Sequence, residues 1–239
     1  MRVLSLIHQT EAASGVFAEA AAVAGHELAE WNVAVEAGPP FEPDAVLAFG
    51  GTMHVDQADR HPWLRDEGEL LRRWLGEGVP VLGVCLGGQL VAKALDAPVR
   101  RMPSAEIGWF AVELTAEAAS DPVFAGLPER FDALEWHSYA FELPNGAVPL
   151  ARNGRCLQAY RAGASAWGLQ FHAETTRETL DHWIESCENG AYDTASLRAA
   201  SDARIADWNS FGRELCRRFL AVAEATPAAA TTRATSRRS

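Results

Sequence analysis

The sequence predicts an α/β fold with a doubly wound, mostly parallel central sheet and an antiparallel extension. In the first half, short apolar runs alternate with segments of helical spacing and are joined by short loops, as in parallel sheets. After about residue 100 the segments become rich in β-forming residues and are separated by Pro and Gly, which indicates antiparallel strands. We expect one domain over residues 1–225 and a disordered tail, rich in Ala, Thr, Ser and Arg, over 226–239.

Apolar runs in the first half predict buried strands, and apolar residues at helical spacing predict the helices between them. The expected strands are 3–7, 27–35, 44–49 and 79–84, and the expected helices are 14–24, 62–75 and 89–95. Residues 52–62 are polar, and we expect a loop there.

The second half contains several shorter β-like runs followed by helical patterns. The expected strands are 107–114, 133–136, 148–151, 157–160 and 166–171. A helix is expected at 176–188, and residues 194–224 are expected to hold one or two more.

Composition and charge exclude several classes of protein. A net charge of −11 argues against a nucleic-acid partner, which requires basic patches. The apolar start of the chain is too short for a signal peptide, and no apolar run approaches the roughly 18 residues of a membrane span. The four cysteines lie far apart with no C-x-x-C pair, so we expect no zinc knuckle, no disulfide framework and a reduced, cytoplasmic setting.

A short stretch, residues 79–92, carries the strongest chemical signal. An apolar run ends at Cys85, and Gly87 and Gly88 lead from it into a helical pattern. Gly83-x-Cys85-x-Gly87 has the form of a nucleophile elbow, a tight strand-to-helix turn that presents a reactive side chain. The helix N-terminus favours a thiolate. A buried cysteine in the βα turn of a nucleotide-binding sheet would give the same pattern.

His172 and Glu174 follow an apolar strand and could serve that thiol. In an extended segment, residues two apart point to the same face, so these side chains would project together at the sheet's carboxyl edge. A thiolate needs a base, and the imidazole base needs an acceptor to orient it. His-x-Glu alone is a weak pattern, but together with the elbow it predicts a Cys-His-Glu site.

Stabilising an oxyanion requires backbone donors, and the sequence offers two. Gly51 follows a buried strand, and Leu86 follows the candidate nucleophile. Their N–H groups could face one crevice. A plain tight turn at residues 50–51 is the alternative.

These motifs resemble the class I (triad) glutamine amidotransferases. The elbow at 83–89 resembles the Gly-x-Cys-x-Gly-x-Gln motif of that family, and Gln170-Phe-His172-Ala-Glu174 resembles its Gln-Phe-His-Pro-Glu segment. The likeness is strongest to stand-alone proteins similar to the amidotransferase domain of GMP synthase, and it covers about residues 1–190. It implies a flavodoxin-like fold and hydrolysis of the glutamine side-chain amide, with release of ammonia and no metal or other cofactor.

The resemblance also implies roles for individual residues. Cys85 would be the nucleophile that forms a γ-glutamyl thioester, His172 the acid and base, and Glu174 the group that orients His172. Gly51 and Leu86 would form the oxyanion hole. Three further residues would bind the amino and carboxylate ends of the substrate, namely Gln89, Ser138 and Tyr139.

Two positions depart from the family pattern. Ala173 replaces the usual proline, which is expected to loosen the strand end. Tyr139 replaces an aspartate found in many relatives, so recognition of the substrate's amino group is expected to differ. Since no synthase domain follows in this sequence, an ammonia acceptor site is expected on a separate subunit or not at all.

Two other functions remain open. The same site could cleave a γ-glutamyl peptide or conjugate, because only the leaving group differs. The chain could also be a non-catalytic regulatory subunit. A zinc deaminase is rejected because the Pro-Cys-x-x-Cys segment is missing.

Other conspicuous residues receive structural interpretations. His54, Asp56 and Asp59 form either a lid or a solvated loop, and the loop is preferred. His137 is interpreted as structural rather than as a second base. The remaining thiols are expected to be buried or half-buried packing groups, namely Cys156, Cys187 and Cys216.

Overall fold

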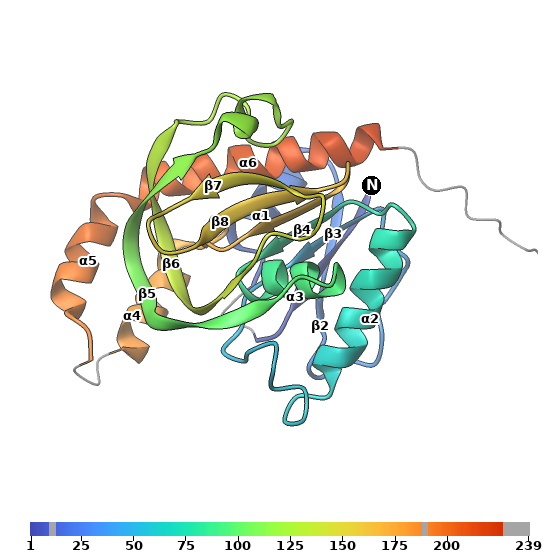
Figure 1. The fold of residues 1–239 in the computed structure, drawn as a ribbon, viewed down its shortest axis with the longest axis horizontal. Helices are drawn as coiled ribbons and strands as arrows, with labels where there is room; N and C mark the ends of the chain where they lie inside the picture. Colours follow the sequence, from blue (N-terminus) through green and yellow to red (C-terminus); the bar gives the residue numbers. More distant parts are fainter. Residues whose placement is uncertain (10–12, 188–190, 227–239) are drawn as a thin grey trace, which may run out of the picture.

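The computed structural model describes residues 1–9, 13–187 and 191–226, and within them nine strands form one sheet (Figure 1). The strand order is β2-β1-β3-β4-β9-β8-β7-β5-β6. The strands are β1 (Arg2–Ile7), β2 (Glu27–Asn32), β3 (Ala45–Ala48), β4 (Val81–Val84), β5 (Val99–Leu114), β6 (Arg130–Phe141), β7 (Val148–Arg152), β8 (Leu157–Ala162) and β9 (Ala166–Leu169).

The first five strands in that order, β2, β1, β3, β4 and β9, are parallel. This order has the flavodoxin-like form, in which ligands bind beyond the carboxyl ends of the strands. Val84 at the end of β4 pairs with Leu169 at the end of β9. The segments that follow β4 and β9 therefore leave the sheet side by side, as a site shared by Cys85 and His172 requires. The predicted fold class is confirmed.

The other four strands, β8, β7, β5 and β6, are antiparallel and extend the sheet from β9. The β5–β6 hairpin is much longer than predicted, because β5 begins at Val99 instead of 107 and β6 covers Arg130–Phe141 instead of 133–136. The register shifts between Arg101 and Glu106. Polar residues and Pro103 at this irregularity break the apolar alternation, so the sequence pattern did not predict the first part of this strand.

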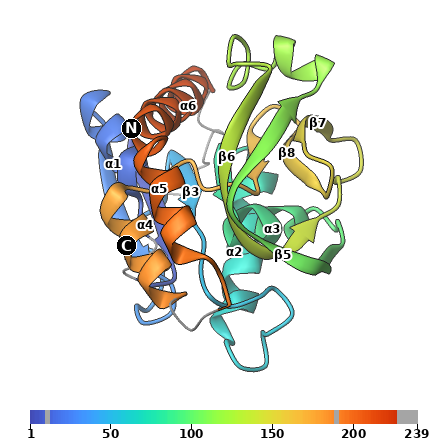
Figure 2. The ribbon, with the colours of Figure 1, turned by 90° about the vertical axis from the view of Figure 1, so that its left-hand side faces the viewer.

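Helices cover both faces of the parallel sheet (Figure 2). They are α1 (Gly15–Val23), α2 (Trp63–Gly76), α3 (Leu86–Ala94), α4 (Arg177–Ser186), α5 (Thr194–Asp202) and α6 (Ile205–Ala225). On one face α2 and α3 bury Leu71, Trp74 and Val91, and on the other α1 and α6 bury Phe17 and Phe219. Each apolar helix face thus contributes to a core against the sheet.

Several predicted boundaries need correction. The strand expected at 27–35 ends at Asn32, and a short 3₁₀ helix, η2 (Ala116–Ser120), was not predicted. The predicted disordered tail begins at the last described residue, Thr226, and otherwise lies outside the described residues. Within the described part of the chain, no helix is both long and apolar enough to cross a bilayer.

Candidate active site

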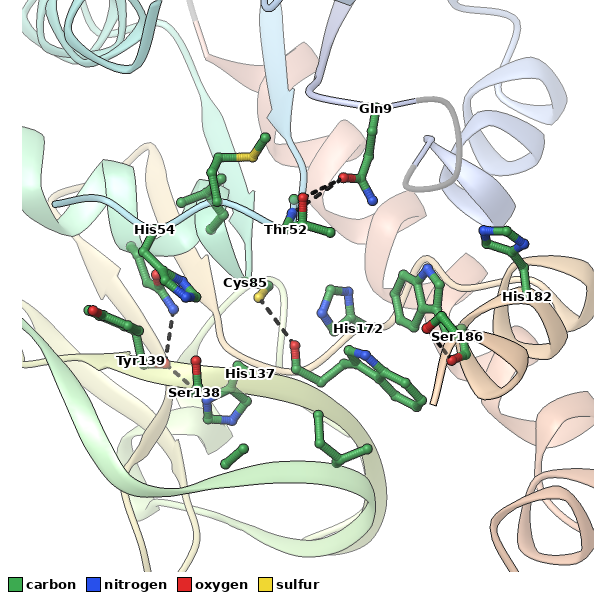
Figure 3. Close-up of a pocket in the computed structure, with 18 of the residues that line it drawn as sticks. Gln9, Thr52, His54, Cys85, His137, Ser138, Tyr139, His172, His182 and Ser186 are labelled. Atoms are coloured by element: carbon green, nitrogen blue, oxygen red, sulfur yellow. Dashed lines mark hydrogen bonds between the residues drawn. The ribbon is translucent and has the colours of Figure 1, made fainter. Parts of the chain in front are cut away.

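A cavity of about 530 Å³ opens at the carboxyl edge of the parallel sheet (Figure 3). Its walls come from the segments after β1, β3, β4 and β9, from β5 and β6, and from α4. The lining includes the predicted residues Gly51, Cys85, Leu86, Gln89, Ser138, Tyr139 and His172. The structure therefore brings together the distant segments that the sequence singled out.

Cys85 stands at a sharp turn between β4 and α3. Its φ of 52° and ψ of −110° are unusual for a residue with a side chain, as expected for a strained functional turn. The turn is tight enough that a Cβ atom at position 87 would lie 2.0 Å from the Ala48 carbonyl oxygen, so only glycine fits there. Helix α3 begins at Leu86, directly after Cys85, and its N-terminal dipole favours a negative charge on the sulfur.

His172 and Glu174 meet as predicted, although by a different backbone path. The predicted strand at 166–171 ends at Leu169, so His172 and Glu174 lie in an irregular segment beyond it. Their side chains still converge, with His172 Nδ1 2.7 Å from Glu174 Oε1, and both are almost fully buried. The prediction of an extended segment was wrong, but the predicted pairing is present.

The charges around His172 favour its protonated form. Burial by itself lowers the pKa of His172, but the Glu174 carboxylate and the Cys85 sulfur outweigh it and raise the pKa well above its usual range. Figure 3 shows the ring between Cys85 and the α4 side of the cavity. The arrangement suits an imidazolium beside a thiolate.

The backbone around His172 is held from two sides. Its N–H donates to the Leu134 carbonyl of β6 at 2.9 Å, and its carbonyl accepts from Trp208 Nε1 of α6 at 2.8 Å. Ala173, which replaces the proline usual in the family motif, is completely buried in this segment. Hydrogen bonds to β6 and α6 hold the histidine in place where the sequence led us to expect a looser strand end.

A buried His8–Glu67 pair, which no sequence motif indicates, holds the Gly50–Gly51 peptide in place. His8 Nδ1 lies 3.0 Å from the Gly50 carbonyl oxygen, and His8 Nε2 lies 2.8 Å from Glu67 Oε2. In a trans peptide, the carbonyl and the next N–H point in opposite directions. With the Gly50 carbonyl directed at His8, the Gly51 N–H points away from His8, which suits an oxyanion donor. His8 follows β1 and Glu67 lies within α2, so no local motif joins them.

Gln89 and the end of β6 form another wall. Gln89 Nε2 donates to the Tyr139 carbonyl at 2.9 Å and lies 3.4 Å from Gln170 Oε1. Ser138 and Tyr139 line the cavity. The residues expected to hold the substrate's ends therefore share one wall.

The loop at 52–62 is docked on the cavity through Tyr139. The Tyr139 ring stacks on His54 with centroids 4.2 Å apart, and its hydroxyl donates to Asp56 Oδ2 at 3.0 Å. Asp59 instead forms an exposed ion pair with Arg65. The preferred interpretation, a solvated loop, thus holds for Asp59, while His54 lines the cavity.

Comparisons with known proteins decide the family. The family model described as glutamine amidotransferase class-I matches residues 20–187, which is most of the chain. The chain belongs to the class I glutamine amidotransferase family.

Known amidotransferases are similar to this chain in sequence and in fold. The glutamine amidotransferase-like protein YfeJ of Salmonella typhimurium is 29% identical over 217 residues, covering 87% of this chain and 91% of YfeJ. The glutamine-hydrolysing GMP synthase of Thermomicrobium roseum is 34% identical over 156 residues, which are 64% of this chain but 28% of the synthase. The crystal structure of a Thermotoga maritima glutamine amidotransferase superposes with a TM-score of 0.83 at 28% identity, covering 92% of this chain and 98% of that one.

Beside the active site, the amidotransferase chain carries a buried polar cluster. His137 is interpreted from the sequence as structural, and its ring is buried between Glu106 Oε2 at 3.2 Å and Glu135 Oε2 at 3.0 Å. Burial lowers the pKa of His137, but the two carboxylates outweigh it and raise the pKa to about 10. Half-buried Cys156 lies 3.6 Å from Glu106 Oε2, and burial raises the pKa of its thiol. Of the other expected packing thiols, Cys187 and Cys216 are buried.

Proposed function

We propose that this class I amidotransferase hydrolyses the side-chain amide of glutamine through a γ-glutamyl thioester on Cys85. One observation carries the proposal: His172, bonded to Glu174 at 2.7 Å, shares the cavity wall with a cysteine held at a strained strand-to-helix turn. A nucleophile, a base and a group that orients the base are the parts that acyl transfer requires.

The reaction divides into two halves. The Cys85 thiolate attacks the amide carbon, and His172 gives a proton to the departing ammonia, leaving a thioester. His172 then takes a proton from water and the hydroxide attacks the thioester. The carbon–sulfur bond breaks, which releases glutamate and a proton and restores the Cys85 thiolate beside protonated His172. Glu174 holds the imidazole in orientation and stabilises its positive charge throughout.

The backbone completes the proposed site. The N–H groups of Gly51 and Leu86 stabilise the oxyanion of each tetrahedral intermediate, and His8 fixes the orientation of the first donor. Gln89 and the backbone of Ser138 and Tyr139 bind the amino and carboxylate ends of the substrate.

The ammonia acceptor belongs to another subunit in this proposal. The match covers 28% of the glutamine-hydrolysing GMP synthase of Thermomicrobium roseum. We therefore propose a small-molecule substrate, a separate synthase-type partner and a cytoplasmic setting, in keeping with cysteines that are all free.

A second candidate is hydrolysis of a γ-glutamyl peptide or conjugate. The cavity of about 530 Å³ lies in the range that holds drug-sized ligands, so it leaves room for a leaving group larger than ammonia. The acyl half of the reaction and the roles of Cys85, His172 and Glu174 would be unchanged.

Ammonia release from glutamine, measured beside amine release from a panel of γ-glutamyl conjugates, tests the proposal. Turnover of glutamine that is lost in Cys85→Ala is the expected result, and stimulation by a second protein would identify the acceptor subunit. Turnover of a conjugate alone would favour the second candidate. No turnover of either, with Cys85 inert toward a glutamine-mimicking electrophile, would leave only a non-catalytic subunit.

A further inference from the structure

Three different chain segments place metal-binding atoms together beneath the β5–β6 hairpin. Glu106 follows the irregularity in β5, His137 lies opposite it in β6, and Cys156 precedes β8. One ligand atom from each residue lies within 4.8 Å of the others. Glu106 and His137 are buried and Cys156 is half-buried, so an ion would have a route from the Cys156 side.

Two of the three separations match those between zinc ligands, and the third lies within 4.8 Å. Zinc binds nitrogen, oxygen and sulfur at about 2.0–2.3 Å in a tetrahedron, so its ligand atoms lie roughly 3.2–3.7 Å apart. Glu106 Oε2 lies 3.2 Å from His137 Nε2 and 3.6 Å from Cys156 Sγ. A thiolate, an imidazole and a carboxylate also form a donor set that zinc favours.

Surrounding groups turn the ligand atoms toward the centre of the cluster. His137 Nδ1 lies 2.9 Å from the Tyr139 carbonyl and donates to it, which leaves Nε2 directed at the cluster. Asn153 Nδ2 donates to Glu106 Oε1 at 2.9 Å, and Gln158 Nε2 donates to both Glu106 Oε2 and Cys156 Sγ at 3.3 Å from the edge of the cluster. Metal-binding histidines and carboxylates are commonly oriented by outer hydrogen bonds of this kind.

A second observation concerns the buried carboxylate of Glu135, which lies beside the cluster. Glu135 is fully buried, and neither of its carboxylate oxygens has a hydrogen-bond partner among the described residues. Oε2 approaches His137 Nε2 to 3.0 Å, but the ring nitrogen also lacks a hydrogen bond of acceptable direction. Glu106 is paired with both His137 and Arg155, whereas the described contacts give Glu135 only the shared His137 and no hydrogen bond. Buried carboxylate oxygens normally have hydrogen-bond partners, so their lack at Glu135 favours a further ligand beside it.

We propose that Glu106, His137 and Cys156 bind a zinc ion, with the Glu135 carboxylate beside it as balancing charge. The ion takes no part in the proposed hydrolysis, which Cys85 and His172 complete without it, and its three protein ligands leave one tetrahedral position open. Its effect reaches the active site through His137. The Nδ1–H of His137 donates to the Tyr139 carbonyl, which also accepts a hydrogen bond from the Gln89 side-chain amide. Zinc would thereby fix the wall that receives the substrate.

Elemental analysis of the purified chain, followed by titration of chelator-treated protein with zinc, tests this site. Wild type should retain stoichiometric zinc, and His137→Ala and Cys156→Ser should lose it. Asn153→Ala, which removes only the outer hydrogen bond to Glu106, should weaken zinc binding by about tenfold to a hundredfold. Cys216→Ala is the matched control, because that thiol is buried elsewhere against the Phe17 carbonyl.

Two further measurements distinguish zinc at this cluster from zinc bound elsewhere on the chain. Cys85→Ala should keep its zinc, whereas loss of zinc in that variant would place the ion at the active site and overturn the proposal. Cobalt bound by wild type should show the absorption of a tetrahedral cobalt thiolate, which does not depend on the folding of any variant. Wild-type protein that contains no zinc and binds neither metal would also overturn the proposal.

Discussion

His8 and Glu67 form a buried pair, with His8 Nε2 2.8 Å from Glu67 Oε2, although 59 positions separate them in the chain. The other nitrogen of the same ring contacts the Gly50 carbonyl. The pair therefore links α2 to the peptide that presents the proposed oxyanion donor Gly51. It gives His8 a positioning role that no motif in the sequence indicates.

Replacing His8 with Phe should reduce kcat for glutamine while leaving KM nearly unchanged. The ring shape is largely kept, but the Gly50 carbonyl loses its partner and the Gly51 N–H is free to turn. Removal of an oxyanion donor lowers kcat by about 100- to 1000-fold. Misalignment of the Gly51 N–H should therefore lower kcat by no more than that factor. Steady-state kinetics measures the effect, and Glu67→Gln, which can still accept from His8, should lose less. A change confined to KM would contradict this role.

Gly50→Ala should impair catalysis without unfolding the protein. A Cβ atom there would lie 2.9 Å from His172 Cε1 and 3.7 Å from Cys85 Cβ, so the imidazole must move. Gly68→Ala is the control, since a Cβ there meets nothing within 4 Å and alanine is favoured in the interior of α2. Activity and thermal unfolding of both variants should be compared. Equal activities would show that the position of the His172 ring is not critical.

The raised pKa of His172 predicts a pH-dependent stability. Its stabilising contribution is complete below pH about 6.5, the pKa of an unfolded histidine, and declines as pH rises toward the higher folded pKa. In the wild-type protein, the contribution of His172 to stability should fall by up to about 1.4 kcal/mol per pH unit above pH 6.5. Glu174→Gln should flatten this slope, because a carboxylate that raises the pKa of His172 is gone. Denaturant unfolding at several pH values measures the slopes, and equal slopes would contradict the assignment.

Tyr139→Asp should lower KM for glutamine and release the loop at 52–62. An aspartate, the residue that the family resemblance suggests here, would offer a carboxylate to the substrate's amino group. The same change removes the stack on His54 and the hydrogen bond to Asp56. Kinetics and hydrogen exchange of the loop amides measure the two effects. Tyr139→Phe separates them, since it keeps the ring but loses the hydroxyl.

Local sequence patterns predicted the parts of the site that depend on neighbouring residues. The apolar run of β4 and its flanking glycines identified the turn at Cys85, because sharp turns and close packing restrict residue type locally. The parallel arrangement of β1, β3 and β4 followed from alternating strands and helices, but β9, which was expected in the antiparallel extension, is parallel to β4. The pairing of His172 with Glu174 was also predicted, but the backbone there bends out of the strand, which the apolar pattern of residues 166–171 did not reveal.

Features that depend on contacts between distant residues could not be predicted from local sequence patterns. The contact of His8 with Gly50 joins the ends of β1 and β3, and the stack of Tyr139 on His54 joins β6 to a loop. The early start of β5 was hidden because Val99 pairs with Phe141 across an irregular register instead of showing an alternating pattern of its own. Spacing along the chain carries no information about such distant pairs.

The most direct test of the proposed mechanism is peptide-mapped mass spectrometry of the chain quenched in acid during turnover of glutamine. We predict a γ-glutamyl group on the peptide that contains Cys85, absent from Cys85→Ala, together with ammonia release by wild type alone. Ammonia released by Cys85→Ala at the wild-type rate, or an acyl group on a different residue, would contradict the mechanism.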